Sequence, residues 1–253
     1  MALNEYTDPP TTPAGGVPDN SVPPIGPVET TQAKIFARLA VEMHEAEGVE
    51  ETVDAVVEFA LQALDCSYAG IALSTRGRPE IPAVTDPIAA EIYRLQLDTR
   101  DGPLTLSMRH RTTVLVRDTT TDTRWPTWAA TVSRLGVRSV LDIPLMLGDE
   151  SRTVGVLGLY SRIPDGFSND DEAIAHILAR HASVAVSSAR HEENMAAAVD
   201  ARKLVGQAMG ILMERFDLDG DLAFAILKRY SQDTNTKLRD VAQTLIDTRD
   251  LPR

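Results

Sequence analysis

The sequence predicts an α+β fold, in which an antiparallel β-sheet flanked by helices is followed by one long helix and a small all-helical region. Three observations lead to this prediction. Short β-branched and apolar runs alternate with helical patterns between residues 68 and 160, as in a sheet packed against helices. Helical spacing precedes them over residues 35–64. After residue 168 the pattern stays helical, and the first helix-breaking signal comes near residues 217–220.

Two amphipathic helices are expected before the sheet, with apolar residues at intervals of three or four. The first apolar stripe consists of Ile35, Leu39, Met43 and Ala46. The second consists of Val53, Val56, Val57, Ala60, Leu61 and Leu64. Each stripe needs a partner, so we expect the two helices to pack closely together.

Four strands are expected in the middle of the chain, because apolar runs end at glycine and turn residues there. The expected strands are residues 68–73, 113–116, 137–146 and 154–160, and helices are expected at 86–97 and 125–135. The connections are short, which favours antiparallel pairing.

A long helix is expected over residues 169–216. Ser168 and Asp171 match a capping box at its start. At 1.5 Å per residue it would be roughly 70 Å long, which exceeds a small domain. Its middle, residues 190–200, is polar and alanine-rich, as in a connector between domains or a coiled-coil stalk.

Two short helices are expected after it, at residues 221–231 and 238–248, with Asn235 or Thr236 as the N-cap of the last one.

Composition narrows the function. The 253 residues include 25 basic and 37 acidic side chains, a formal charge of −12. No apolar run reaches the ~18–20 residues of a membrane helix, and residues 1–30 lack a secretion signal, so we expect a cytoplasmic protein with no membrane partner. Residues 1–30 hold 7 of the 15 prolines and no Lys or Arg, which predicts a disordered Pro-rich tail.

Catalytic and metal-binding patterns are missing from the sequence. A single cysteine, Cys66, excludes an intrachain disulfide and a CxxC motif, and its apolar surroundings favour a buried thiol over a nucleophile. His176 and His181 are five residues apart, whereas zinc pairs on a helix usually lie four apart. There is no phosphate loop and no dinucleotide fingerprint. We therefore expect no catalytic residue, no metal and no cofactor.

The C-terminal region resembles the ANTAR domain. The resemblance rests on residues 205–216 (VGQAMGILMERF), residues 223–224 and residues 227–242 (LKRYSQDTNTKLRDVA), and it spans nearly all of residues 200–248. Met209 stands where many members carry Lys, so a positive charge available to RNA in those members is missing here.

The preceding region resembles a GAF sensor domain. The matching residues are Asp101-Gly102-Pro103, Asp118, Arg124-Trp125-Pro126, Gly136-Val137-Arg138-Ser139, Ile143-Pro144-Leu145, Gly155, Tyr160-Ser161 and Phe167-Ser168. Leu104 stands where related GAF–ANTAR proteins often show Cys after Gly-Pro, which argues against thiol-based sensing. The resemblance divides the chain into a GAF-like domain at 31–188 and an ANTAR domain at 189–253.

The two resemblances together imply a transcription antitermination regulator of the actinobacterial type. ANTAR domains act as dimers that bind paired hairpins in nascent transcripts and change termination or, in some settings, translation. RNA loops are recognised by cations, amides, hydroxyls and aromatic rings. The candidate RNA-binding residues are Lys203, Lys228, Arg229, Tyr230, Ser231, Gln232, Asn235, Lys237 and Arg239. On charge alone, a basic patch and an ordinary solvated face remain equally open.

A GAF domain implies a small-molecule ligand of unknown identity. Sensor pockets are mostly apolar with a few polar groups, so we expect a cavity between the sheet and its covering helices. The candidate lining residues are Tyr68, Leu104, Trp125, Trp128, Leu141 and Tyr160. A filled core without a ligand is the open alternative.

A parallel homodimer is expected, because the polar middle of the long helix cannot bury a core alone. Two other functions stay open. One is a dimeric signalling module whose tail helices bind protein, although the polar turn at residues 231–237 is unlike an apolar docking groove. The other is a GAF-type methionine sulfoxide reductase, which would need several thiols.

Overall fold

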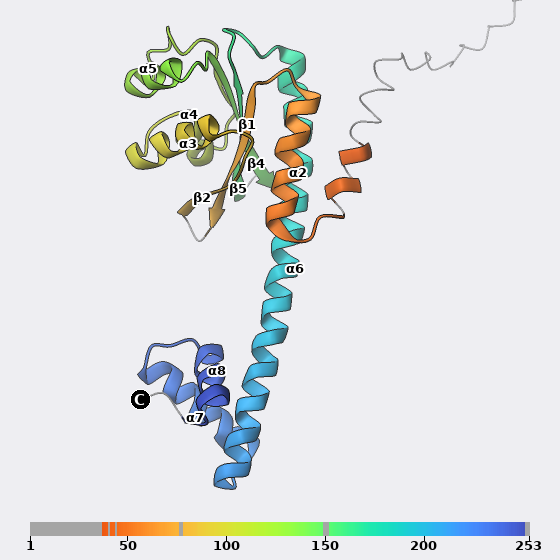
Figure 1. Ribbon diagram of the computed structural model, residues 1–253, viewed down its shortest axis with the longest axis vertical. Helices are drawn as coiled ribbons and strands as arrows, with labels where there is room; N and C mark the ends of the chain where they lie inside the picture. The colour runs from red at the N-terminus through yellow and green to blue at the C-terminus, as the bar shows by residue number, and fades with distance from the viewer. Residues whose placement is uncertain (1–36, 40, 44, 76–77, 149–151, 251–253) are drawn as a thin grey trace, which may run out of the picture.

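The computed structural model describes residues 37–39, 41–43, 45–75, 78–148 and 152–250. The tail predicted for residues 1–30 lies outside them. A β-sheet is covered by helices on both faces, and one helix leaves this domain and reaches a second, helical domain at the C-terminal end (Figure 1).

The sheet has five strands in the order β2-β1-β5-β4-β3, and every neighbouring pair is antiparallel. The strands are β1 (Tyr68–Thr75), β2 (Arg78–Val84), β3 (Val114–Val116), β4 (Ser139–Leu147) and β5 (Arg152–Ser161). The predicted antiparallel sheet is thereby confirmed.

Strand β2 was not among the predicted strands. It contains Pro79 and Pro82, and most of its residues are exposed or half-buried. Proline removes a ladder donor and is tolerated at a sheet edge, where β2 pairs only with β1. The apolar alternation that marks a strand in sequence is therefore absent from it.

Alternate residues of each strand point to opposite faces of the sheet. In β1, Ala69, Ile71 and Leu73 belong to one buried cluster, whereas Tyr68 and Ala72 belong to another. The sheet thus has two separate cores, one on each face.

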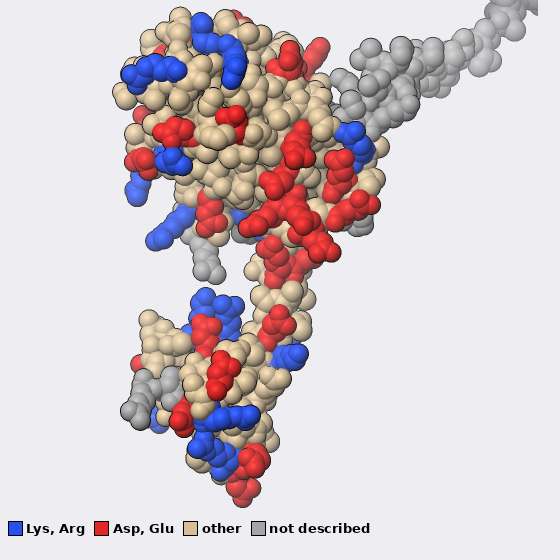
Figure 2. All heavy atoms as spheres, in the orientation of Figure 1, with Lys and Arg blue, Asp and Glu red and all other residues tan. Residues whose placement is uncertain are grey.

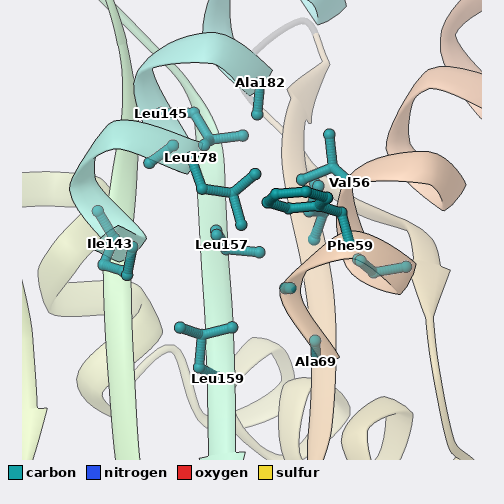
Figure 3. Close-up of a cluster of buried hydrophobic side chains, with 14 of the residues drawn as sticks. Val56, Phe59, Ala69, Ile143, Leu145, Leu157, Leu159, Leu178 and Ala182 are labelled. Atoms are coloured by element: carbon teal, nitrogen blue, oxygen red, sulfur yellow. The ribbon is translucent and has the colours of Figure 1, made fainter. Parts of the chain in front are cut away.

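The first core, called the α2–α6 core below, is apolar. Helices α2 (Gly48–Ala63) and α6 (Asn169–Phe216) cover this face. Figure 3 shows the side chains that meet there from the two helices and the sheet: Val56, Phe59, Leu178, Ala182, Ala69, Ile143, Leu145, Leu157 and Leu159.

The second core, called the sensor core below, lies under three short helices. They are α3 (Pro87–Thr99), α4 (Pro103–His110) and α5 (Pro126–Arg134). Each begins with proline, which suits the first helical turn because its missing N–H would be unpaired there. Helix α4 was not predicted, since its eight residues are too few to show a clear period.

Helix α6 confirms the long-helix prediction at both ends. The Ser168–Asp171 capping box starts it, and Asp217 ends it in the left-handed region at φ 52°. Residues 191–200 are all exposed. Among the described residues, no helix is long and apolar enough to cross a membrane.

The end of α6 packs against α7 (Gly220–Asp233) and α8 (Leu238–Thr248). Their shared core contains Ala208, Leu212, Ala223, Leu227, Val241, Ala242 and Leu245. The predicted cap of α8 is wrong: the N-cap is Lys237, with no side-chain hydrogen bond. Asn235 instead adopts φ 51° in the turn, a conformation that asparagine tolerates better than most residues.

Candidate RNA-binding surface and sensor core

Most of the predicted RNA-binding residues lie together on the last turns of α7 and the start of α8. We call residues 228–239 the turn segment. Its exposed members are the predicted Lys228, Arg229, Gln232, Asn235, Lys237 and Arg239, together with Asp233. Lys203 is also exposed, but it lies on α6, outside this segment.

Internal hydrogen bonds hold the turn segment in one shape. The Ser231 hydroxyl donates to the Thr236 carbonyl at 2.7 Å, and the Thr234 hydroxyl donates to the Tyr230 carbonyl at 2.6 Å. The Thr236 N–H donates to the Ser231 carbonyl at 3.1 Å. Such a turn presents Asn235 to solvent without further ordering cost, which favours recognition.

Two of the predicted residues also serve the domain's own structure. Tyr230 is half-buried against the core of α6, α7 and α8, and Ser231 is half-buried with its hydroxyl committed to Thr236. The phenol ring and the hydroxyl are therefore less open to a partner than the neighbouring cations.

The charge of the turn segment is mixed. Arg229 lies 3.5 Å from Asp233, and Arg239 lies 3.1 Å from Asp240, both as exposed pairs. Exposed pairs are weak, so a phosphate could replace these carboxylates. Three of the four lysines in the chain, at positions 203, 228 and 237, lie in this domain. Figure 2 shows acidic side chains gathered where α6 leaves the sheet, and acidic and basic side chains interspersed on the C-terminal helices.

In the first domain, the structure brings together five of the six predicted ligand-lining residues. The sensor core contains Tyr68, Leu104, Trp125, Trp128 and Tyr160. Leu141 does not join them, because it faces the opposite side of β4 and lies in the α2–α6 core. Its neighbour Asp142 takes the position facing α3 to α5.

Two of these five residues already have polar or cationic partners. The Tyr68 hydroxyl accepts from the Arg162 guanidinium, which also lies over the Tyr68 ring. Trp125 makes an edge-to-face contact with Trp128, with ring centroids 6.2 Å apart, and Arg124 lies 4.6 Å from the Trp125 ring centroid. These contacts fix the rim of the sensor core.

Asp142 is the residue that sequence reasoning missed. It is fully buried, and neither carboxylate oxygen has a hydrogen-bond partner among the described residues. Burial raises the pKa of the Asp142 carboxyl to about 8 because a low-dielectric site disfavours the charged form. A signal existed in the sequence: a lone acidic residue inside the apolar run Val140–Met146.

Tyr93 and Tyr160 flank this carboxyl. Their rings meet edge to face with centroids 5.9 Å apart, and the Tyr93 hydroxyl donates to the Gly70 carbonyl at 2.6 Å. Burial raises the pKa of both phenols well above the usual value, and the nearby Asp142 adds to this.

The lone thiol lies on the other side of the sheet. Cys66 packs against the α2–α6 core, and its sulfur lies 3.8 Å from the Ala60 carbonyl oxygen. Burial raises the pKa of the Cys66 thiol to about 12. The thiolate, which is the nucleophilic form, is therefore scarce at neutral pH.

Three pockets on the described surface lie away from the sensor core. The largest of the three, about 990 Å³, lies where α6 leaves the sheet and includes Glu47, Glu50 and Glu193. The others, about 620 and 330 Å³, lie along α6 beside His176 and His181. The two histidines are thus separated, and the described residues contain no group of three or more possible metal ligands.

Several residues that carry the GAF resemblance have structural roles. Arg138 donates to Asp118 at 2.9 Å and holds the pKa of that carboxyl well below its usual range. Arg124 donates to Asp122 at 2.6 Å and to the Leu115 carbonyl at 2.8 Å. These contacts hold the loops around β3.

The family models match the same two regions. The GAF domain model matches residues 48–186, and the ANTAR domain model matches residues 193–246. The chain belongs to the GAF domain family and ends in an ANTAR domain. Both are regulatory domain types, so this GAF–ANTAR protein belongs to the general class of regulatory proteins. Among curated proteins, none matches the sequence.

Solved GAF domains share the fold of the first domain. The GAF domain of a phosphoenolpyruvate-protein phosphotransferase from Coxiella burnetii has a TM-score of 0.52 at 17% identity, covering 65% of this chain and 98% of that chain. The Acinetobacter phosphotransferase domain gives 0.50 at 17%, with 65% and 98% covered. Free methionine-R-sulfoxide reductase from Neisseria meningitidis gives 0.50 at 13%, with 66% and 95% covered. At these identities the GAF–ANTAR protein shares a fold with them and no more.

Proposed function

We propose that this protein is an RNA-binding regulator that binds paired hairpins in nascent transcripts and controls transcription termination. A ligand or signal at the GAF domain would modulate this activity. Such a role places the protein in the cytoplasm. In this proposal the chain consists of a sensor domain at residues 31–188 and an RNA-binding domain at residues 189–253.

One observation carries the proposal: within a matched ANTAR domain, exposed cations and amides lie together on a hydrogen-bonded turn. Lys228 and Gln232 are four residues apart on α7 and share a face, and Asn235 and Lys237 follow in the turn. Cations supply phosphate contacts and amides can read base edges. The polar turn at residues 231–237 is unlike the apolar groove that a protein-binding helix pair needs.

Helix α6 supplies a direct connection for regulation. Two residues of α6 form hydrogen bonds with the sensor domain near the point where the helix leaves it. Arg190 donates to the Ser74 carbonyl at 3.3 Å, and Glu193 accepts from the Val49 N–H at 2.8 Å. Beyond them the same helix continues into the RNA-binding domain. A change of packing in the sensor domain could therefore shift or rotate the helix as a unit.

We infer that α6 also forms a parallel homodimer. Five of the six exposed large apolar residues of α6 lie on one side of the helix: Ile177, Val184, Met195, Val199 and Met213. At 100° per residue they fall within a sector of about 60° on one side of the helix. A second copy of α6 would cover this stripe over both domains.

The reductase alternative has little support in this chain. Its only thiol has a raised pKa and lies on the opposite side of the sheet from the sensor core. Reduction of a sulfoxide by thiols would leave one cysteine without a resolving partner.

RNA binding can be tested with Lys237→Ala and Arg229→Ala in filter-binding titrations of a paired-hairpin RNA at several salt concentrations. Each variant should weaken binding and reduce the slope of log K against log salt by about 0.7–0.9, since each lost phosphate contact releases one counterion fewer. Arg109→Ala, at an exposed position of α4, is the matched control and should leave both quantities unchanged. Unchanged affinity and slope in both test variants would exclude the assignment.

Dimerisation can be tested with Met195→Glu and Ala197→Glu. Both residues are exposed in the same turns of α6, but they lie on opposite sides of the helix. Sedimentation equilibrium should give twice the chain mass for the parent protein and for Ala197→Glu, and a monomer at micromolar concentration for Met195→Glu. A monomeric parent protein that still binds RNA would contradict the dimer.

A further inference from the structure

The unpaired buried polar atoms are concentrated on one side of the sheet. Five buried side-chain atoms of the described residues lack a hydrogen-bond partner: Ser107 Oγ, Trp128 Nε1, Asp142 Oδ1, Asp142 Oδ2 and Tyr160 Oη. All of them belong to α4, α5, β4 and β5 and face the sensor core. Because an unpaired buried polar group destabilises a fold, such groups usually have a partner or a function.

The sheet floor beneath these atoms is formed by two glycines, and the side chains of Tyr93, Tyr160 and Asp142 lie directly against them. Gly70 on β1 pairs with Gly158 on β5, and Gly158 pairs with Asp142 on β4, so the three residues form one row across the sheet. Two neighbouring positions in this row have no side chain. The Tyr93 ring and the Asp142 carboxyl therefore lie over the backbone of these two glycines.

Three oxygen atoms converge over Gly158. A Cβ atom built on Gly158 would lie 2.5 Å from the Tyr93 hydroxyl, 2.7 Å from the Tyr160 hydroxyl and 2.8 Å from Asp142 Oδ1. The oxygens come from α3, β5 and β4 and surround one point. Two of them, on Asp142 and Tyr160, have no hydrogen-bond partner.

We propose that the sensor core binds a small organic cation bearing an ammonium or guanidinium group, with the Asp142 carboxylate as its counter-charge and the Tyr160 hydroxyl as a second acceptor. This assignment rests on the proposed function only in that the GAF domain acts as a sensor. It names the chemical class of the signal.

A cation fits the acceptors better than an anion or a neutral molecule. A buried carboxylate needs an opposite charge or donated hydrogen bonds, and the nearby arginines are committed elsewhere, Arg138 to Asp118 and Arg162 to Tyr68. The titratable groups that flank it, Tyr93 and Tyr160, are uncharged at neutral pH. An anion would meet a carboxyl group at the same point.

The other side chains of the sensor core indicate which further groups the ligand would carry. Aromatic rings from α3, α5 and β5 can attract a cation through their faces, and Leu104, Val140 and Val156 add apolar surface. Trp128 Nε1 is an unused donor that would suit one acceptor atom on the ligand. Burial raises the pKa of Asp142 to about 8, so a bound cation would favour its ionised form and release a proton at neutral pH.

The full-length protein should be titrated by isothermal calorimetry at pH 8 with phenethylammonium, benzylammonium, methylammonium and agmatine. Benzyl alcohol and phenylacetate serve as the neutral and anionic counterparts. At least one cation should bind the parent protein and raise its melting temperature in proportion to concentration, whereas the two counterparts should not.

Asp142→Asn should reduce the affinity for that cation at least about thirtyfold, because it removes one partner of a buried charge pair. Asp98→Asn is the matched control: the same substitution at an exposed position of α3 should leave affinity unchanged. Tyr160→Phe, which keeps the ring, should weaken binding by up to about tenfold, and an unchanged affinity in this variant overturns the proposal if Asp142→Asn does not fold.

The proposal is overturned if none of the cations binds the folded parent protein, or if the cation binds Asp142→Asn as tightly as the parent. RNA titrations of the same preparations separate this outcome from the proposed function. Intact RNA binding without cation binding would reject only the ligand class. Cation binding without RNA binding would reject only the regulator of transcripts.

Discussion

The two faces of the sheet differ in how they treat buried polar groups. In the α2–α6 core, the buried hydroxyls of Thr52 and Ser183 donate to carbonyls one turn earlier, at 2.7 and 2.6 Å. In the sensor core, Ser107, Asp142 and Tyr160 are just as buried but leave polar atoms unpaired. The buried hydroxyls of the α2–α6 core are thus paired, whereas the sensor core retains buried polar atoms without a hydrogen-bond partner.

This difference suggests a division of labour within one sheet. The saturated face holds the first half of α6, the helix that leads to the C-terminal domain. The unsaturated face lies under three short helices, which can adjust more readily than a 48-residue helix that is fixed between two domains. Because side chains alternate along each strand, the same strand serves both faces, so Asp142 on one face is one residue away from Leu141 and Ile143 on the other.

The largest expected effect comes from the same truncation on each face. Leu178→Ala in α6 should lower the free energy of unfolding by about 3–5 kcal/mol, because the rigid neighbours cannot fill the cavity. Leu104→Ala in α4 should cost about 2–3 kcal/mol, because a short helix can move inward. Both leucines are essentially inaccessible, so urea denaturation of the two variants compares the faces directly.

Equal losses in the free energy of unfolding for Leu178→Ala and Leu104→Ala would contradict this comparison, because they would mean that the short helices are as rigid as α6. A larger cost at Leu104 would reverse it.

A second effect, of medium size per pH unit, is expected from the titration of Asp142. The pKa of Asp142 is raised from 3.8 to about 8 in the folded chain. Between these values the unfolded chain has released its proton while the folded chain keeps it, so the free energy of unfolding should fall as pH rises, by up to about 1.4 kcal/mol per unit. Below about pH 4 and above about pH 8 this contribution should be flat.

Asp142→Asn should remove this slope, since an amide does not titrate in that range. Urea denaturation from pH 4 to 9 would measure it, with Asp98→Asn as the matched exposed control. A profile for Asp142→Asn as steep as that of the parent protein would mean that other groups cause the pH dependence.

The fold was predictable where the signals are local. The capping box at Ser168 and the residues before Gly220 mark both ends of α6, because caps satisfy backbone groups within one turn. Strand β2 was missed because its stability comes from pairing with β1 rather than from its own apolar pattern. The cap of α8 was misplaced because the left-handed turn at Asn235 competes with capping for the same residue.

The sites were predictable to different degrees for the same reason. The turn segment is contiguous in sequence, so its cations and amides can be grouped from the sequence alone. The sensor core is assembled from seven separate elements, β1, β3, β4, β5, α3, α4 and α5, and the alternation of side chains along each strand decides which residues enter it. Choosing Leu141 over Asp142 put an apolar residue on the expected face, but the true neighbours are Val140 and Asp142. A shift of one residue in a strand exchanges its two faces.

The smallest expected effect comes from two serines that differ only in their hydrogen bonds. Ser107 and Ser183 are both fully buried in helices, but the Ser107 hydroxyl is unpaired and the Ser183 hydroxyl donates to Ala179. Ser183→Ala should cost about 0.5–1.5 kcal/mol because it removes a hydrogen bond, whereas Ser107→Ala should be neutral or stabilising by up to about 1 kcal/mol because it removes an unpaired group. Urea denaturation at pH 6 measures both. A loss of stability in Ser107→Ala equal to that of Ser183→Ala would show that the Ser107 hydroxyl is satisfied, by water for instance, and that the two faces are alike in this respect.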